Sequence, residues 1–293
     1  MTGEETVVAD FVCRYAENPK DGVGAEPETG RVVMSEKRLV VAGDDRITIP
    51  LSAVVDVVSG NVPPNFRDLF DSTVTIGYRA DGDAVETILI ESGEEKISKF
   101  RTILFKVLLN GTKAKVRHPA RIGGRVTDSP VRNAKLSISS GRVAFKTKNG
   151  GFSIELTTVI DFDRSERSLD ATSRSTLLIR HADDGQATTT LISPASTRRL
   201  NLLGRYLRVE YQKLLSSVAD IDLSGPETRL LVTIYATDGD IDFTTVLDGD
   251  AARATNVLNS LRKKELIEEQ GADIELTSKG QIIVSRRIED VNI

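Results

Sequence analysis

The sequence predicts an α+β chain in which one strand-rich unit occurs twice, followed by a more helical carboxy-terminal module. The first observation is a repeat: residues 30–41 read as two apolar runs joined by a polar turn, and residues 134–145 show the same pattern. Downstream segments match in the same order, residues 49–56 with 154–161 and residues 72–76 with 175–179. The second observation is that this pattern stops at residue 220. Because the matches keep their order, we interpret the repeat as a duplicated domain.

Short apolar strands bounded by turn residues make up the first unit. Its hairpin turns at Ser35-Glu36-Lys37-Arg38 and places Val32 and Met34 on one face. The other strands are expected at residues 7–15, 47–51, 54–58, 74–78 and 85–90. The connections between strands are expected to include a loop or helical turn at residues 61–71 and a turn at Asp81-Gly82, which Asp184-Gly185 matches in the second unit.

Each unit ends in an amphipathic helix. Ser92 and Glu95 have the spacing of a capping box, and the apolar residues that follow recur at helical spacing, at Ile97, Phe100, Leu104 and Leu108. The second helix is expected to begin near Ser193-Pro194, because proline is tolerated in a first turn. Its apolar stripe consists of Leu200, Leu203, Leu207, Tyr211 and Leu214. Stripes at this spacing predict core packing and not a ligand site.

The order of strands and helix, with the GRVVMSEKRL hairpin near the start, resembles the pleckstrin-homology and GRAM superfold. This resemblance implies two tandem pleckstrin-homology/GRAM-like β-barrel units, each closed by a carboxy-terminal helix. The first unit would span residues 1–112 and the second residues 113–219.

Residues 220–293 predict a winged helix-turn-helix domain. Ser224 and Glu227 form a second capping box that begins a helix, Asp238-Gly239-Asp240 interrupts it, and residues 243–247 read as a short second helix. A third helix is expected over residues 250–264, and its exposed face would carry Arg253, Asn256 and Arg262.

The wing of this domain is expected at residues 266–276, with a turn at Gly271. The LTSKG segment that follows is similar to the end of many winged-helix proteins.

The composition of this 293-residue chain indicates a folded protein with more than one domain. With 39% hydrophobic and 28% charged residues it can bury more than one core, so two or three domains are expected. Its start, MTGEETVVADF, is acidic where a signal peptide is basic, and no run approaches the roughly 18 apolar residues of a membrane-spanning helix. A cytoplasmic location is therefore expected. The single cysteine, Cys13, lies in an apolar run and is interpreted as a small buried hydrophobe.

Charge is distributed unevenly along the chain. Residues 1–95 carry 8 basic and 19 acidic residues, whereas residues 96–148 carry 14 basic residues and the single acid Asp128. Such a segment is either a solvated face or an electrostatic footprint for an acidic partner. The candidate partner-binding patch consists of Lys113, Lys115, Arg117, Arg121, Arg125 and Arg132.

A winged helix suggests DNA binding, in which Arg253, Asn256 and Arg262 would reach base edges. However, residues 220–293 carry 8 basic and 15 acidic residues. Because neutralised phosphates supply much of the affinity for DNA, this charge opposes nucleic-acid binding. We expect a protein-docking module instead.

The sequence lacks the motifs of the common catalytic and cofactor-binding sites. Its two histidines, His118 and His181, have no metal-ligand spacing to a cysteine or carboxylate, and neither a phosphate-cradling glycine loop nor a G-x-S-x-G elbow occurs. Asp161 and Asp163 are interpreted as turn residues after a strand. We expect no catalytic residue, no cofactor, no metal and no small-molecule substrate, and therefore no enzyme.

The whole chain resembles the archaeal CheF family of taxis proteins, from ADFVCRY through GRVVMSEKRL and KVRHPARIGGRV to the winged carboxy terminus. The resemblance implies an adaptor that connects the response regulator CheY and the accessory proteins CheC and CheD to the motor and switch proteins of the archaellum. It implies a place near the archaellum base, at the inner face of the membrane. It also implies a CheY partner with an acidic face, to which an arginine-rich patch is complementary.

Two other functions stay open at this point. A membrane-recruited scaffold would use a pleckstrin-like unit and the basic segment to bind anionic head groups. A transcription regulator would use the winged helix. Liposome flotation separates the scaffold from the adaptor, and a mobility shift at physiological salt separates the regulator.

Overall fold

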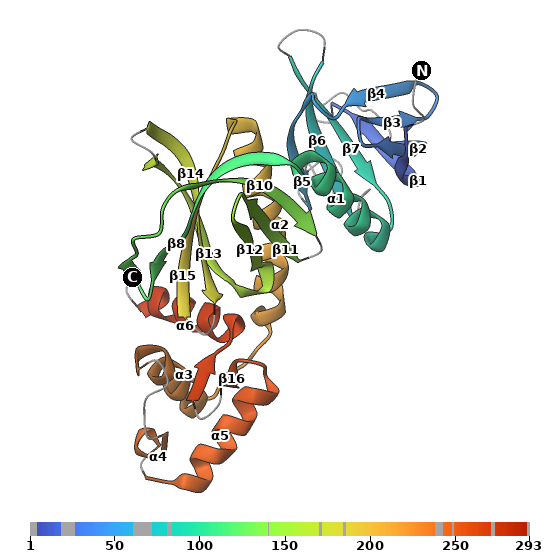
Figure 1. Ribbon diagram of the computed structural model, residues 1–293. Helices are drawn as coiled ribbons and strands as arrows, with labels where there is room; N and C mark the ends of the chain where they lie inside the picture. The colour runs from blue at the N-terminus through green and yellow to red at the C-terminus, as the bar shows by residue number, and fades with distance from the viewer. Residues whose placement is uncertain are drawn as a thin grey trace.

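The computed structural model describes residues 5–18, 27–60, 72–80, 84–139, 141–169, 172–183, 186–237, 243–247, 249–270 and 273–291. It is an α+β structure with two antiparallel sheets of 7 and 8 strands and a smaller helical module with a 2-stranded sheet. Figure 1 shows the eight-stranded sheet between the other two parts. Several expected connections lie outside the described residues: the loop at 61–71, the helix break at Asp238-Gly239-Asp240, and the turns at Asp81-Gly82, Asp184-Gly185 and Gly271.

The first sheet has the strand order β4-β3-β2-β1-β7-β6-β5. The hairpin between β2 and β3 has the predicted turn, and Val32 and Met34 are fully buried. The strands of the sheet are β1 (Val7–Glu17), β2 (Glu28–Ser35), β3 (Arg38–Ala42), β4 (Arg46–Pro50), β5 (Val54–Ser59), β6 (Thr73–Arg79) and β7 (Val85–Glu91).

The second sheet has the order β12-β11-β10-β8-β15-β14-β13, with the short β9 paired to β8. Apart from β9, this is the strand order of the first sheet. Its elements are β8 (Thr112–Ile122), β9 (Arg125–Val126), β10 (Arg132–Ser139), β11 (Arg142–Thr147), β12 (Gly150–Glu155), the short helix η2 (Leu156–Thr158), β13 (Val159–Leu169), β14 (Thr172–Asp183) and β15 (Gln186–Pro194). Asp161 and Asp163 lie within β13, so their interpretation as turn residues was wrong.

The expected closure into β-barrels is not observed among the described strands. Each sheet is an open ladder, with β4 and β5 at the two ends of the first and β12 and β13 at the two ends of the second. At one of these ends, β5 packs against the helix α2 (Thr197–Ala219) of the other unit.

The helix that follows each sheet also contacts the other sheet. Helix α1 (Glu94–Leu109) packs on β1 and β6 of its own sheet and on β10 of the second, while α2 packs on β14 and β15 and on β5 of the first. The rings of Phe105 on α1 and Tyr206 on α2 meet at 5.4 Å between centroids. The two sheets therefore share one continuous hydrophobic core. The predicted apolar stripes are confirmed as core, with Tyr211 partly buried at the edge.

The starts of both helices differ from the prediction. The Ser92 hydroxyl donates to the Val12 carbonyl at 3.1 Å, and α1 begins after Gly93 without a side-chain cap. Ser193 and Pro194 still belong to β15, and Ser196 caps α2 by accepting a hydrogen bond from the Arg199 N–H. A side-chain bond to a distant strand thus takes Ser92, and strand pairing takes Ser193 and Pro194, although local spacing assigned all three to helix starts.

Two arginines on α2 hold β5 from outside the core. Arg198 donates to the main-chain carbonyls of Val54 and, at 2.6 Å, Leu51. Arg205 donates two hydrogen bonds of 2.9 Å each to the Asp56 carboxylate. Apolar packing and polar contacts thus join the two sheets along the same edge.

The carboxy-terminal module packs around its own core, into which α2 inserts Leu214 and Val218. The module contains α3 (Gly225–Thr237), α4 (Phe243–Val246), α5 (Ala251–Lys263), β16 (Ile267–Gln270), β17 (Asp273–Leu276) and α6 (Ser278–Val291). The capping box at Ser224 and the third helix are confirmed, whereas α6 was not predicted. Across the described residues, no helix has the length and hydropathy needed to span a membrane.

Candidate functional site

The predicted basic patch begins on β8, which lies between β10 and β15 (Figure 1). Alternation along the strand buries Ala114 and Val116 and turns Lys113 and Lys115 to the opposite face. Gly123 and Gly124, with φ of 53° and 80°, make the turn into β9. This left-handed backbone favours glycine, so the two glycines fix where the hairpin turns.

Arg117 has a structural contact and is not part of an open surface. Its guanidinium donates to the Thr127 carbonyl, and the Thr127 hydroxyl donates in turn to the Pro119 carbonyl. Arg117 is half-buried. It therefore ties the segment after β9 back to β8.

Arg121 and Arg125 lie on the β8–β9 hairpin, close to the carboxy-terminal module. Next to them, Ile122 and Val126 leave 37% and 67% of their surface exposed, and Tyr235 of α3 is 37% exposed. Arg180 on β14 donates to the Tyr235 hydroxyl at 3.4 Å. These residues border a groove of about 940 Å³, which Glu275 also lines. We call six of its lining residues the hairpin surface: Arg121, Ile122, Arg125, Val126, Arg180 and Tyr235.

Lys113 and Lys115 belong to a different hollow, on the face of β8, β10 and β11 that points away from the core. Its volume is about 600 Å³. Four further basic residues line it that the sequence reasoning did not select: Lys135, Lys146, Lys148 and Arg174. We call these six basic residues the lysine hollow. The signal that would have found Lys135 and Lys146 is the strand pairing, because Lys135 lies opposite both Lys113 and Lys146.

Arg132, the last residue of the predicted patch, is exposed at the start of β10, opposite Val116. The structure thus divides the patch. Two of its residues enter the hairpin surface, two enter the lysine hollow, and Arg117 and Arg132 have separate surroundings.

The predicted face of the third helix is present on α5. Arg253, Asn256 and Arg262 are all exposed, while Ala254 and Leu261 on the other side of the helix are buried. Asp250 caps the helix by accepting from the Arg253 N–H at 2.9 Å.

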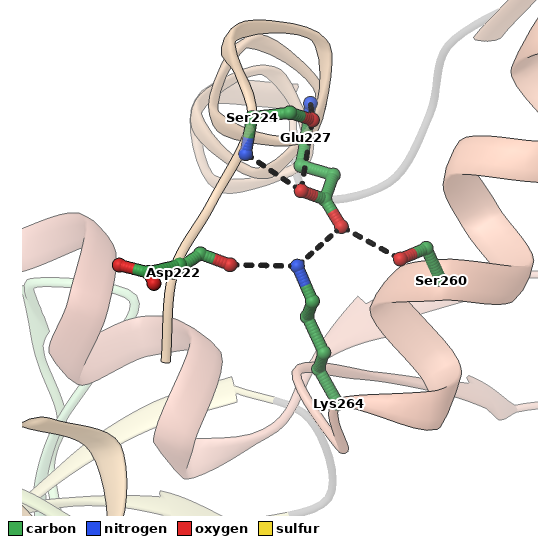
Figure 2. A network of polar contacts seen from close by, with 5 residues as sticks. All are labelled: Asp222, Ser224, Glu227, Ser260 and Lys264. Atoms are coloured by element: carbon green, nitrogen blue, oxygen red, sulfur yellow. Dashed lines mark hydrogen bonds and ion pairs between the residues drawn. The ribbon is translucent and has the colours of Figure 1, made fainter. Parts of the chain in front are cut away.

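The core side of α5 is held by a buried carboxylate, as Figure 2 shows. Glu227 is 5% exposed, and its two carboxylate oxygens accept from the Ser224 N–H and the Ser260 hydroxyl, each at 2.7 Å. Lys264 donates to the same carboxylate at 2.7 Å and to the Asp222 carbonyl at 2.7 Å. Burial alone would raise the pKa of Glu227, but the bonds from Lys264, Ser224 and Ser260 outweigh it and lower the pKa to about 2. These contacts fix α3 against α5 and hold the exposed face in place.

His118 and His181, distant in sequence, lie side by side in the second sheet. Their ring centroids are 5.8 Å apart, and both rings contact the Thr190 hydroxyl oxygen, at 2.8 and 3.0 Å. His118 also stacks on Phe152 at 4.0 Å. Burial lowers the pKa of both histidines. Over the described ranges, no group of three or more His, Cys, Asp or Glu side chains is placed to hold a metal ion.

Cys13 is buried in the core of the first sheet. Burial raises the pKa of its thiol to about 11, which keeps it in the unreactive thiol form near neutral pH.

Comparison with known proteins gives a family match. A family model described as "Archaeal Chemotaxis signal transduction system protein F" matches residues 7–213. Taxis protein CheF2 of Halobacterium salinarum is 39% identical over 290 residues, which cover 99% of each chain. Taxis protein CheF1 of the same organism is 24% identical over 298 residues, covering 99% of this chain and 100% of its own length.

A solved structure, the C-terminal domain of an unknown protein from Leishmania infantum, aligns with 36% of this chain and 85% of its own. The TM-score is 0.27 at 12% identity, a likeness too small to describe the fold.

Proposed function

Because this chain belongs to the archaeal chemotaxis signal transduction system protein F (CheF) family, we propose that it is a non-enzymatic adaptor of archaeal taxis. In this role it links the response regulator CheY, with CheC and CheD, to the motor and switch proteins of the archaellum. It works at the inner face of the membrane, near the archaellum base. An adaptor needs several protein-binding surfaces, and the chain offers two distinct candidates, the hairpin surface and the exposed face of α5.

The proposed domain organisation follows from the strand orders. Residues 1–112 and 113–219 form two tandem pleckstrin-homology/GRAM-like units, because each contains the same sheet topology followed by one long helix. Residues 220–293 form a winged helix-turn-helix domain, in which α5 is the third helix and β16 and β17 are the wing. The acidic charge of this domain supports docking of proteins over nucleic acid.

The observation that carries the proposal is the composition of the hairpin surface. Arginine and tyrosine are the residues that dominate binding energy in protein interfaces, and here they alternate with exposed Ile122 and Val126. Guanidinium groups pair with carboxylates through two parallel hydrogen bonds. The hairpin surface therefore fits an acidic protein face, which the family resemblance expects of CheY.

The test is the double substitution Arg121→Glu and Arg125→Glu. We expect slower association with CheY and a weaker dependence of that rate on salt, because charges at an interface rim act mainly on the on-rate. Stopped-flow association at several ionic strengths measures both quantities. Arg117 is left unchanged, since Glu at this position would break the contact to Thr127.

A matched control carries Arg46→Glu and Arg79→Glu, which change the charge equally at exposed positions of the first sheet. The control variant should bind CheY at the wild-type rate. Equal rates for the hairpin variant and the wild type, with an unchanged melting temperature, would remove the hairpin surface from the CheY interface.

A further inference from the structure

Three lysines stand in one row across neighbouring strands of the second sheet. The strand register places Lys113 of β8 opposite Lys135 of β10, and Lys135 opposite Lys146 of β11. All three side chains are exposed on the same face, because directly opposed residues of an antiparallel pair point to one side. We call these three residues the lysine row.

This arrangement works against stability. Like charges directly opposite each other destabilise an antiparallel sheet. Within the described ranges, no ion pair joins Lys113, Lys135 or Lys146 to a carboxylate. Among the described residues, the sheet thus holds three ammonium groups together without a carboxylate paired to any of them.

The surroundings of the row add cations and hydrogen-bonding groups. Lys115, Lys148 and Arg174 complete the lysine hollow, and no acidic residue is among its described lining. Asn133, Thr147 and Ser193 add an amide and two hydroxyl groups to the same lining. The volume of about 600 Å³ lies within the usual range of roughly 300–1,000 Å³ for small-ligand sites.

We propose that the lysine hollow binds a compact, multiply phosphorylated group. Five of its six cations are lysines, which act as point charges on flexible stems and can converge on clustered phosphate oxygens. A planar carboxylate is instead recognised best by the arginine fork, which prevails on the hairpin surface. The two basic surfaces therefore select different anions.

This site is separate from the proposed CheY interface. Protein interfaces bury about 1,200–2,000 Å² and have aromatic or apolar anchors at their centre, whereas the lysine hollow is a small concavity lined by polar and small side chains. Substitutions in the lysine hollow should therefore leave CheY association unchanged, and the hairpin variant should keep its phosphate binding.

The test uses inorganic tripolyphosphate as the probe and the full chain. Isothermal titration calorimetry should show binding to the wild type. The triple variant Lys113→Gln, Lys135→Gln, Lys146→Gln should bind at least about tenfold more weakly, because it removes several charge-assisted hydrogen bonds. A matched control, Lys96→Gln, Lys99→Gln, Lys106→Gln, removes the same charge from exposed positions of α1 and should bind like the wild type.

Two further arms identify the source of the phosphate and the class of anion. Vesicles of phosphatidylglycerol, compared with vesicles of phosphatidylcholine, show whether a lipid head group presents the phosphate. If only the phosphatidylglycerol vesicles bind, and the triple variant loses this binding, the result still supports a phosphate site. Polyglutamate tests for carboxylates. The proposal is overturned if neither phosphate probe binds, if the triple variant binds them as well as the control does, or if polyglutamate binds equally tightly with the same sensitivity to the substitutions.

Discussion

Arg14 on β1 and Lys115 on β8 occupy matching positions in two sheets of the same strand order, but their neighbours differ. Arg14 lies opposite Glu91 of β7, and the two side chains form an ion pair at 3.5 Å. Lys115 lies opposite Ser193 of β15, at the edge of the lysine hollow. The matching positions thus hold an Arg–Glu ion pair in the first sheet and, in the second, a lysine opposite a serine.

The lysine row shows the same contrast. Its counterpart in the first sheet runs from Val12 through Arg31 to Ala42, so this row holds a single cation. Arg31 donates two hydrogen bonds, of 2.7 and 2.8 Å, to the Asp10 carboxylate. A hollow is present at the matching place in the first sheet, but Glu91 and Glu94 are among its lining residues.

The shared fold determines the inward positions of the two sheets and not the outward ones. Inward residues such as Val32 and Met34 in one sheet and Leu136 and Phe145 in the other are buried and apolar. Outward residues do not contribute to that core, so they can differ between the two sheets. In the first sheet the two outward cations at the matching positions pair with carboxylates of the same chain, whereas the lysine row of the second sheet needs an external anion.

The substitution Phe105→Ala tests whether the two sheets unfold as one unit. Phe105→Ala removes a buried ring that packs on Tyr206 of the other unit, and large-to-small core changes cost about 3–5 kcal/mol. Denaturant unfolding followed by circular dichroism should show one transition at a lower midpoint. Val85→Ala, at a residue 58% exposed, is the control and should change stability by about 0.5 kcal/mol or less. Two separate transitions in Phe105→Ala would mean that the sheets unfold independently.

The buried carboxylate of Glu227 in the carboxy-terminal module gives the second effect. The pKa of Glu227 is lowered from 4.5 to about 2 in the folded chain, so its bonds to Lys264 and Ser260 stabilise the fold fully above about pH 4.5. This contribution, on the order of 3 kcal/mol, is lost as the pH falls toward about 2.

The variant Glu227→Gln removes the carboxylate charge and so isolates its contribution to the free energy of unfolding. The difference in unfolding free energy between wild type and variant should be largest above about pH 4.5 and shrink toward zero near pH 2. A difference that stays constant over this range would show that the carboxylate charge does not stabilise the module.

Local patterns were enough to predict the strands of the first sheet, both hairpins and the apolar stripes of α1 and α2. The β2–β3 hairpin and the capping box at Ser224 depend on neighbours a few residues away, which spacing reports directly. The predicted start of α1 at Ser92 failed because the hydroxyl bonds to Val12 on a strand 80 residues earlier. Spacing along the chain carries no information on such a partner.

The candidate sites show the same limit. Charge counting found Lys113 and Lys115, but their neighbours Lys135 and Lys146 come from other strands and are joined to them only by pairing across the sheet. Counting also placed Arg117 in an open patch, although its guanidinium is bonded to Thr127. The contact between the histidines arises in the same way, from pairing of β8, β14 and β15.

The smallest change in stability is expected from Lys135→Glu, and it depends most directly on the difference in charge pairing between the two sheets. Lys135→Glu converts two like-charge pairs, with Lys113 and Lys146, into two opposite-charge pairs. Each cross-strand pair contributes about 0.2–1 kcal/mol, so we expect a gain of about 1 kcal/mol and a melting temperature higher by about 2–4 °C. Arg31→Glu makes the same change of charge at the matching position of the first sheet, where it breaks the pair with Asp10 and should lower the melting temperature. Thermal unfolding of both variants at low salt measures the sign, and added salt should reduce both shifts because the charges are exposed. If Lys135→Glu lowered the melting temperature as Arg31→Glu does, the lysine row would be stabilised by contacts within the chain, and it would not need an external anion.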